Sequence, residues 1–167
     1  MYISVKHAVL GEDDGCRRIA MFCIRKITMP KRIQRRRTKN FRLPPHTKCC
    51  TRPGFWSNPF TGRHAVQWFR FWLLRFPDAR ADTIGASAQF LNDGMNLDDT
   101  ADPDKTGNDF LSALGELDQY DFLACYCPLG RACHVDVLLH LLEELRNLQI
   151  RKASAGLLRK ASNGLRG

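Results

Sequence analysis

The sequence predicts a small α/β protein, a layered fold with a short, mainly parallel sheet flanked by helices. Residues 121–126 form a continuous apolar run, typical of a central strand that is covered by helices on both sides. Residues 62–76 and about 134–148 carry the apolar spacing of amphipathic helices. Over 109–148 a helix, a strand, a loop and a second helix follow one another, and this order favours a parallel sheet.

The chain has 167 residues, 44% of them hydrophobic, which suits one domain with a real core. We expect an N-terminal appendage at 1–30 that need not belong to the fold, a single α/β domain at 31–148 and a flexible basic tail at 149–167. Met29, directly before a basic segment, is a candidate start of the protein. The tail is predicted to be non-helical because a glycine recurs in each of its two near-repeats.

The cysteine content and the apolar runs indicate which cellular location to expect. No run approaches the ~18 apolar residues of a membrane span, and residues 1–30 lack the uninterrupted apolar stretch of a signal peptide. Seven cysteines, without the spacing of a disulfide framework, favour thiols or metal ligands in a reducing environment. We therefore expect a cytoplasmic protein with no membrane partner.

The net charge of +9 is unevenly distributed along the chain. Segments 31–42 and 146–167 contain half of the Lys and Arg residues and no acid, whereas the body between them is acidic. The first segment, with Arg35, Arg36 and Arg37 at its centre, is predicted to engage the phosphates of a nucleotide or nucleic acid. The alternative is that both segments are solvated arms.

The remaining elements follow from local patterns. Residues 47–51 indicate a short strand, 52–60 a loop, and Thr61 a cap for the helix at 62–76. Residues 77–108 are predicted to be an irregular insertion with one short helix near 86–91, and 109–117 a short helix. The aspartates of the insertion lack the ordered spacing of an EF-hand, so they are expected to be solvated rather than to bind a cation.

The loop after the apolar strand is the first candidate site. Cys125 and Cys127 stand two residues apart where the strand ends, and Cys133 and His134 fall at the start of the next helix. In open α/β sheets, ligands bind in the crevice beyond the carboxyl ends of the strands. The position of this loop therefore predicts a functional site.

Three interpretations of this loop remain open. Cys133 can be a reactive thiolate, since a helix N-terminus and Arg131 would both lower its pKa, with His134 binding an anion or polarising a substrate. Cys125, Cys127, Cys133 and His134 can instead bind zinc, although residues two apart on a strand reach one ion only if the chain curls. Cys125 and Cys127 can also be small core residues.

The loop after the predicted strand at 47–51 is the second candidate site. It contains Arg52, Trp56 and Asn58 between two prolines. Arginine offers a fork for phosphate, tryptophan a face for a base, and asparagine both a donor and an acceptor. The alternative is a rigid turn in which Trp56 is packed as a lid.

Several motifs occur together and in order: Arg32–Lys39, Arg42–Pro44, Arg52-Pro53, Trp56–Phe60, Leu123–Leu129 and Cys133–Leu138. This combination resembles domain of unknown function 4326, a family met in bacteria and their phages, over about 31–145. The family usually has glycine and tryptophan where this chain has Ser57 and Tyr126, and Val-Tyr-Val-Gly where it has residues 48–51. The resemblance implies the domain boundaries, the pairing of the two loops and a phage- or prophage-type protein, but no established activity.

We therefore expect a protein that binds a phosphate-bearing ligand, a nucleotide or nucleic acid. The basic segment would contact phosphates, and the pocket would be lined by Arg52, Trp56, Asn58, Cys127, Arg131, Cys133 and His134. One alternative is a cysteine-dependent enzyme that acts on a nucleotide or modified base through Cys133 and His134. The second is a zinc-stabilised interaction module without catalysis, which the aromatic helix at 68–76 would suit.

Overall fold

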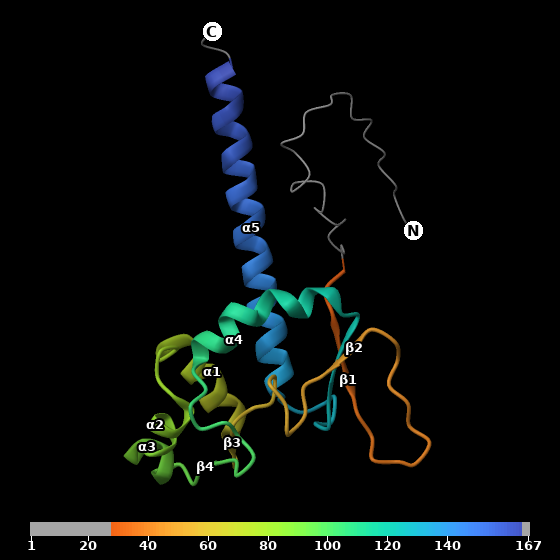
Figure 1. The fold of residues 1–167 in the computed structure, drawn as a ribbon, viewed down its shortest axis with the longest axis vertical. Helices are drawn as coiled ribbons and strands as arrows, with labels where there is room; N and C mark the ends of the chain where they lie inside the picture. The colour runs from red at the N-terminus through yellow and green to blue at the C-terminus, as the bar shows by residue number, and fades with distance from the viewer. Residues whose placement is uncertain (1–27, 165–167) are drawn as a thin grey trace.

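Three short parallel strands form the sheet that positions the candidate sites (Figure 1). The computed structural model describes residues 28–164, and their side chains up to residue 155. The strands are β1 (Lys31–Gln34), β2 (Thr47–Cys49) and β5 (Phe122–Cys125), in the order β1-β5-β2. Ala124 of the central strand pairs with Ile33 on one side and Cys49 on the other. The small α/β fold and its central apolar strand are confirmed.

The helices bury one aromatic core against this sheet. They are α1 (Ala65–Arg75), α4 (Gly107–Ala113), the 3₁₀ turn η1 (Leu114–Gln119) and α5 (His134–Gly164). Phe69 and Trp72 of α1 are fully buried, and both rings pack near Phe110 of α4, with centroids 5.4 and 5.6 Å away. The two buried aromatics lie on the predicted apolar face of α1, while Phe71, Leu74 and Phe76 remain exposed.

Residues 77–108 are more ordered than the sequence predicts. They contain α2 (Ala81–Gly85), α3 (Ala88–Asn92) and β4 (Asn96–Leu97), which pairs antiparallel with β3 (Phe60–Thr61). The single predicted helix corresponds to α3, whose Phe90 is fully buried, as is Met95 after it. The other elements are too short to show a period in the sequence.

α4 begins two residues earlier than predicted because a capping box starts it. The Thr106 side chain accepts from the Asp109 backbone N–H, and the Asp109 carboxylate accepts from the Thr106 backbone N–H. This reciprocal pair satisfies two amides that a helix start otherwise leaves without partners.

The C-terminal region is helical, so the prediction of a flexible tail is wrong for residues 149–164. In Figure 1, α5 projects well beyond the other described helices and the strands. Glycine costs about 1 kcal/mol relative to alanine in a helix. Alanine, leucine, arginine and lysine dominate the segment and no proline interrupts it, so helix formers outweigh the glycines.

The predicted N-terminal appendage lies mostly outside the described residues. Of its last residues, Met29 packs against the core, and the Thr28 carbonyl accepts a hydrogen bond of 3.4 Å from Arg146. Residues 28–30 therefore belong to the fold. Among the helices that the structure describes, none has the length and apolarity needed to cross a membrane.

Candidate functional site

The parallel strands end at one edge of the sheet, and cysteines stand at two of these ends. Cys125 is the last residue of β5, and Cys49 is the last residue of β2, followed by Cys50. Beyond β5 the chain leaves the extended conformation, so that the Sγ atoms of Cys125 and Cys127 lie 3.5 Å apart. The curl that a shared ion would require is therefore present.

α5 begins at His134 and brings the second half of the cysteine loop to the same place. The Sγ atoms of Cys125 and Cys133 each lie 3.9 Å from His134 Nδ1, and the three atoms lie within 4.8 Å of one another. All three residues are buried. This Cys/His cluster, defined as Cys125, Cys133 and His134, could hold a metal ion. Cys127, the fourth predicted ligand, lies beside Cys125 but outside the group of atoms that are all within 4.8 Å of one another.

The imidazole of His134 is oriented by a backbone carbonyl. Its Nε2 lies 2.8 Å from the carbonyl oxygen of Cys50, which can only accept, so Nε2 carries the proton of this bond. In the neutral ring Nδ1 then has a lone pair directed at the sulfur atoms. Metal-binding histidines are typically held in this way, with the second ring nitrogen donating to a carbonyl or carboxylate.

A hydrogen bond between Cys125 and Cys133 shifts the pKa values of their thiols in opposite directions. A hydrogen bond from Cys133 lowers the pKa of the Cys125 thiol to about 3, although burial raises it. The same hydrogen bond, together with burial, raises the pKa of Cys133. Cys133 is also 0% exposed. Complete burial keeps a substrate from reaching the Cys133 thiol, which argues against Cys133 as an attacking thiolate.

A hollow of about 590 Å³ lies over the cluster and is called the arginine pocket here. Cys125, Cys127 and His134 line it from the cysteine loop, and the start of α1 lines it from the other side. Its arginines are Arg37, Arg52, Arg63 and Arg131, and none of its described lining residues is acidic. The pocket thus brings together predicted residues from the basic segment and both loops.

Arg52 lines the pocket, but its guanidinium is committed elsewhere. Nε donates to the Asn58 carbonyl at 3.2 Å and Nη2 to the Phe60 carbonyl at 2.8 Å, while Nη1 forms an ion pair with Asp98 at 2.9 Å. Every side of the guanidinium has a partner. Arg52 therefore ties the loop together, which argues against the predicted contact of this residue with a phosphate.

Asn58 and Trp56 are also structural. Asn58 Nδ2 donates to the Ala65 carbonyl at 3.0 Å, and its Oδ1 accepts from the Phe60 backbone N–H at 2.9 Å. Trp56 is 1% exposed and packs edge-on against Phe110. These contacts argue against the prediction that the two residues bind a ligand and favour the alternative interpretation of a rigid turn with a packed tryptophan.

Some arginines of the basic segment have structural partners, and others are exposed at the surface. Arg32 donates to the carbonyls of Pro128, Leu129 and Arg131 and pairs with Asp136, so it fixes the cysteine loop from β1. These partners occupy its guanidinium, which argues against the predicted phosphate contact at this residue.

The arginines after β1 lie around Tyr126. Arg35 contacts Cys49 Sγ at 3.1 Å and Thr51 Oγ1 at 3.2 Å, and its guanidinium lies 5.1 Å from the centroid of the Tyr126 ring. The Arg37 guanidinium lies 4.8 Å from the same centroid. Arg36 is exposed. Burial raises the pKa of Cys49, but hydrogen bonds with Thr51 and the charge of Arg35 outweigh it and lower the pKa overall.

Sequence reasoning missed Arg63 and the part played by Tyr126. Arg63 stands two residues after Thr61, the predicted cap of the first helix, whereas the helix begins at Ala65 with His64 as its cap. The basic residue beside a predicted helix start was the available signal. Tyr126 stands between two cysteines and lines the pocket. Its separation from Arg35 and Arg37 by some 90 residues left no local signal in the sequence.

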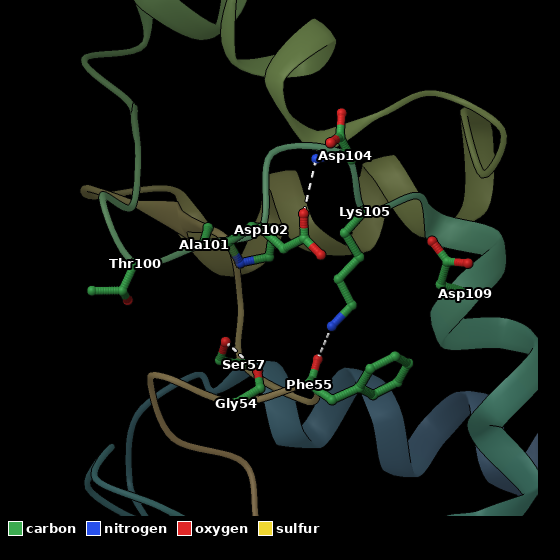
Figure 2. A pocket seen from close by; sticks show the side chains of 10 residues that line it. Gly54, Phe55, Ser57, Thr100, Ala101, Asp102, Asp104, Lys105 and Asp109 are labelled. Carbon is green, nitrogen blue, oxygen red and sulfur yellow. Dashed lines mark hydrogen bonds between the residues drawn. The ribbon is translucent and has the colours of Figure 1, made fainter.

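A second hollow, of about 450 Å³, lies on the other side of the Arg52–Phe60 loop (Figure 2). Figure 2 shows the Lys105 amine directed at the Phe55 carbonyl, to which it donates. The amine also lies 3.6 Å from the centroid of the Phe55 ring, and burial lowers its pKa to about 8. Asp102, Asp104 and Asp109 line this hollow, so it is unsuited to phosphate.

Comparison with known families agrees with the range of the fold. The profile of the family described as Domain of unknown function (DUF4326) matches residues 33–144, two thirds of the chain. The match includes the second half of β1, both loops and the start of α5, and so every residue that lines the pocket. No curated protein and no solved structure matches the chain.

Proposed function

The chain belongs to the DUF4326 family, and we propose that it binds a phosphate-bearing ligand of nucleotide size in the arginine pocket. One observation carries this proposal. The exposed side chains of Arg37, Arg63 and Arg131 line one hollow, and no described acidic residue lines it with them. Converging like charges repel one another, and an anion between them relieves the repulsion.

The place and size of the pocket support a small ligand. It lies beyond the carboxyl ends of parallel strands, where open α/β sheets bind their ligands. Its volume of about 590 Å³ falls within the range of ligand sites in proteins. Val66 and Ala132 also line it, so an apolar part of a nucleotide would have a surface to contact. The guanidinium fork matches phosphate geometry better than a lysine would.

Calorimetric titration with inorganic phosphate, pyrophosphate and a panel of nucleoside mono- and diphosphates tests this proposal. The wild-type protein is expected to bind at least one nucleotide of the panel. Because a charge-assisted hydrogen bond contributes about 1.5–3 kcal/mol, Arg63→Ala/Arg131→Ala should bind that nucleotide at least tenfold more weakly. Arg75→Ala, which removes a charge from the exposed end of α1 outside the pocket, is the control and should bind as the wild type does.

Two results would contradict the proposal. The first is a wild-type protein that binds nothing in the panel. The second is an Arg63→Ala/Arg131→Ala protein that binds as tightly as the wild type while remaining folded by circular dichroism.

A specific observation favours a second function, a zinc site at the Cys/His cluster. Zn–S bonds of about 2.3 Å in a tetrahedral site place the ligand atoms roughly 3.8 Å apart. The distances from Cys125 Sγ to Cys127 Sγ and from both Cys125 and Cys133 Sγ to His134 Nδ1 are 3.5, 3.9 and 3.9 Å. Thiolate and imidazole are the donors that zinc prefers, and Cys50 supplies the carbonyl that orients the imidazole.

Elemental mass spectrometry on untagged, reduced protein tests the zinc site. About one zinc per chain is expected in the wild type, with Cys125, Cys127 and Cys133 protected from alkylation until a chelator is added. Cys133→Ser should lose the metal, whereas Cys49→Ser, at the end of the neighbouring strand, should retain it. A metal-free wild type with one fast-reacting thiol would contradict the zinc site and favour the cysteine-dependent enzyme.

A further inference from the structure

A third hollow adjoins the arginine pocket and is also basic. It has a volume of about 450 Å³ and is lined from the segment after β1 by Arg35, Arg36, Arg37, Phe41 and Arg42, and by Tyr126. We call it the arm hollow. None of its described lining residues is acidic. It is therefore a second concave surface with the charge that suits a phosphate.

The arm hollow and the arginine pocket share a wall. Arg37 and Tyr126 line both of them. A ligand in the arginine pocket could thus extend past Tyr126 into the arm hollow without meeting an acidic lining residue on the way. Through these two shared residues, the hollows adjoin as one basic surface.

The shared wall is ordered before any ligand arrives. The guanidiniums of Arg35 and Arg37 lie 5.1 and 4.8 Å from the centroid of the Tyr126 ring, within cation–π range. Cys49 and Thr51 hold Arg35 from its other side. Side chains that are already immobilised lose less conformational entropy on binding, which favours recognition of a flexible ligand.

The outer part of the arm hollow is free to contact a ligand. Arg36 and Arg42 are exposed, and within residues 28–164 neither has an acidic partner at ion-pair distance. Phe41 is half-buried and presents an aromatic surface between them. Basic grooves combined with aromatic side chains are characteristic of proteins that bind single-stranded nucleic acid.

We propose that the ligand is a single-stranded nucleic acid of at least two nucleotides, with one phosphate in the arginine pocket and a neighbouring phosphate in the arm hollow. The inference rests on the proposed function of the arginine pocket. A duplex keeps its bases stacked and its backbones apart, so it would not enter two small adjoining hollows. A single strand places successive phosphates and unstacked bases within reach of both.

Fluorescence anisotropy with 5′-labelled thymidylate chains of one to eight nucleotides tests the inference. Affinity should rise as the chain lengthens from one nucleotide and then level off. Arg36→Ala/Arg42→Ala should weaken binding of the eight-nucleotide chain at least tenfold. Its salt dependence, the slope of log K against log salt concentration, should fall by about 1.4, since each phosphate contact on a single strand contributes about 0.7. Binding of thymidine monophosphate, measured by calorimetry, should not change.

Lys31→Ala/Lys39→Ala is the matched control. It removes two positive charges from the same segment, but neither lysine lines the arm hollow. Its affinity and salt slope for the eight-nucleotide chain should stay close to those of the wild type. An equal loss in both double variants would overturn the inference, because general attraction to the basic segment would then explain the binding.

The remaining outcomes separate this inference from the proposed function. Nucleotide binding through Arg63 and Arg131 that gains nothing from a longer chain would overturn the inference alone. A hairpin duplex that binds as tightly as the single strand would do the same. Binding that depends on Arg36 and Arg42 but not on Arg63 and Arg131 would contradict the proposed function of the arginine pocket. It would also contradict the inference that one ligand occupies both hollows.

Discussion

Two loops follow neighbouring strands of the same sheet and both carry polar side chains, yet they use these side chains in opposite ways. In the loop after β2, the side chains of Arg52 and Asn58 form hydrogen bonds with nearby backbone groups, and Arg52 also forms an ion pair with Asp98. In the loop after β5, Cys127 and Arg131 line the arginine pocket, and His134 turns a lone pair toward thiols. Residue type alone does not separate a binding loop from a structural one.

The difference arises from how each loop satisfies its own backbone. The loop after β2 uses its side chains to pair the carbonyls of Asn58, Phe60 and Ala65, which a buried loop must satisfy. The loop after β5 is held from outside instead, by Arg32 of β1 on three of its carbonyls. A loop that is tied by another element keeps its own side chains available for chemistry.

Asn58→Ala should break the loop after β2 and have the largest effect. It leaves the buried Phe60 amide without a partner, at about 1–3 kcal/mol, and removes the additional bond to the Ala65 carbonyl, worth about 1 kcal/mol. We expect the free energy of unfolding in urea to fall by about 2–4 kcal/mol. Ser57→Ala, which removes only an exposed bond to Gly54, is the control and should lose less than about 1 kcal/mol. Equal losses of unfolding free energy in the two variants would contradict the structural role of the Asn58 side chain.

Arg32→Ala should test the external tie of the loop after β5. The side chain is 8% exposed and has three carbonyl partners and one carboxylate. Because these acceptors would lose charge-assisted donors, we expect a loss of about 2–3 kcal/mol in the same urea experiment. Arg32→Lys should recover little, since one ammonium cannot reach acceptors spread along the loop. Arg36→Ala, at an exposed position, should change the free energy by less than about 0.5 kcal/mol.

Arg63→Ala/Arg131→Ala should leave stability almost unchanged while it removes ligand binding. Surface substitutions away from structural partners usually stay within about 0.5 kcal/mol, and the loss of two converging charges should stabilise the fold slightly at low salt. Thermal unfolding in low and high salt measures this. A loss of several kcal/mol would mean that these arginines, like Arg52, serve the fold.

The sequence predicted the centre of the molecule better than its edges. The apolar run of β5, the core face of α1 and the Cys/His cluster follow from patterns within a few residues. The sequence left the structural and the binding roles of Arg52 and Trp56 both open, because their partners Asp98 and Phe110 lie some 50 residues away. Short elements such as α2 and β4 have too few residues to show a period, and α5 continues through glycines because helix formers surround them.

Lys105 gives the smallest predicted effect, on the pH dependence of stability. Burial lowers its folded-state pKa to about 8 from an ordinary value of 10.5. Between these values the unfolded chain binds more protons at this residue than the folded one, so its contribution to stability should rise with pH through that window. In urea titrations under reducing conditions, Lys105→Met should show a smaller rise from pH 8 to pH 10 than the wild type. An identical rise would contradict the burial of this amine.

Nitrogen-15 NMR of the arginine Nε–H groups tests the contrast between the two loops most directly. The signals are assigned by the variants Arg52→Lys, Arg63→Ala and Arg131→Ala, and the wild-type protein is titrated with thymidine diphosphate and with the other diphosphates of the panel. We expect the Arg63 and Arg131 signals to shift with the bound nucleotide, while that of Arg52, whose Nε donates to the Asn58 carbonyl, stays in place. A shift of the Arg52 signal alone, or no shift of Arg63 and Arg131 with any of these ligands, would contradict the assignment of binding to the arginine pocket.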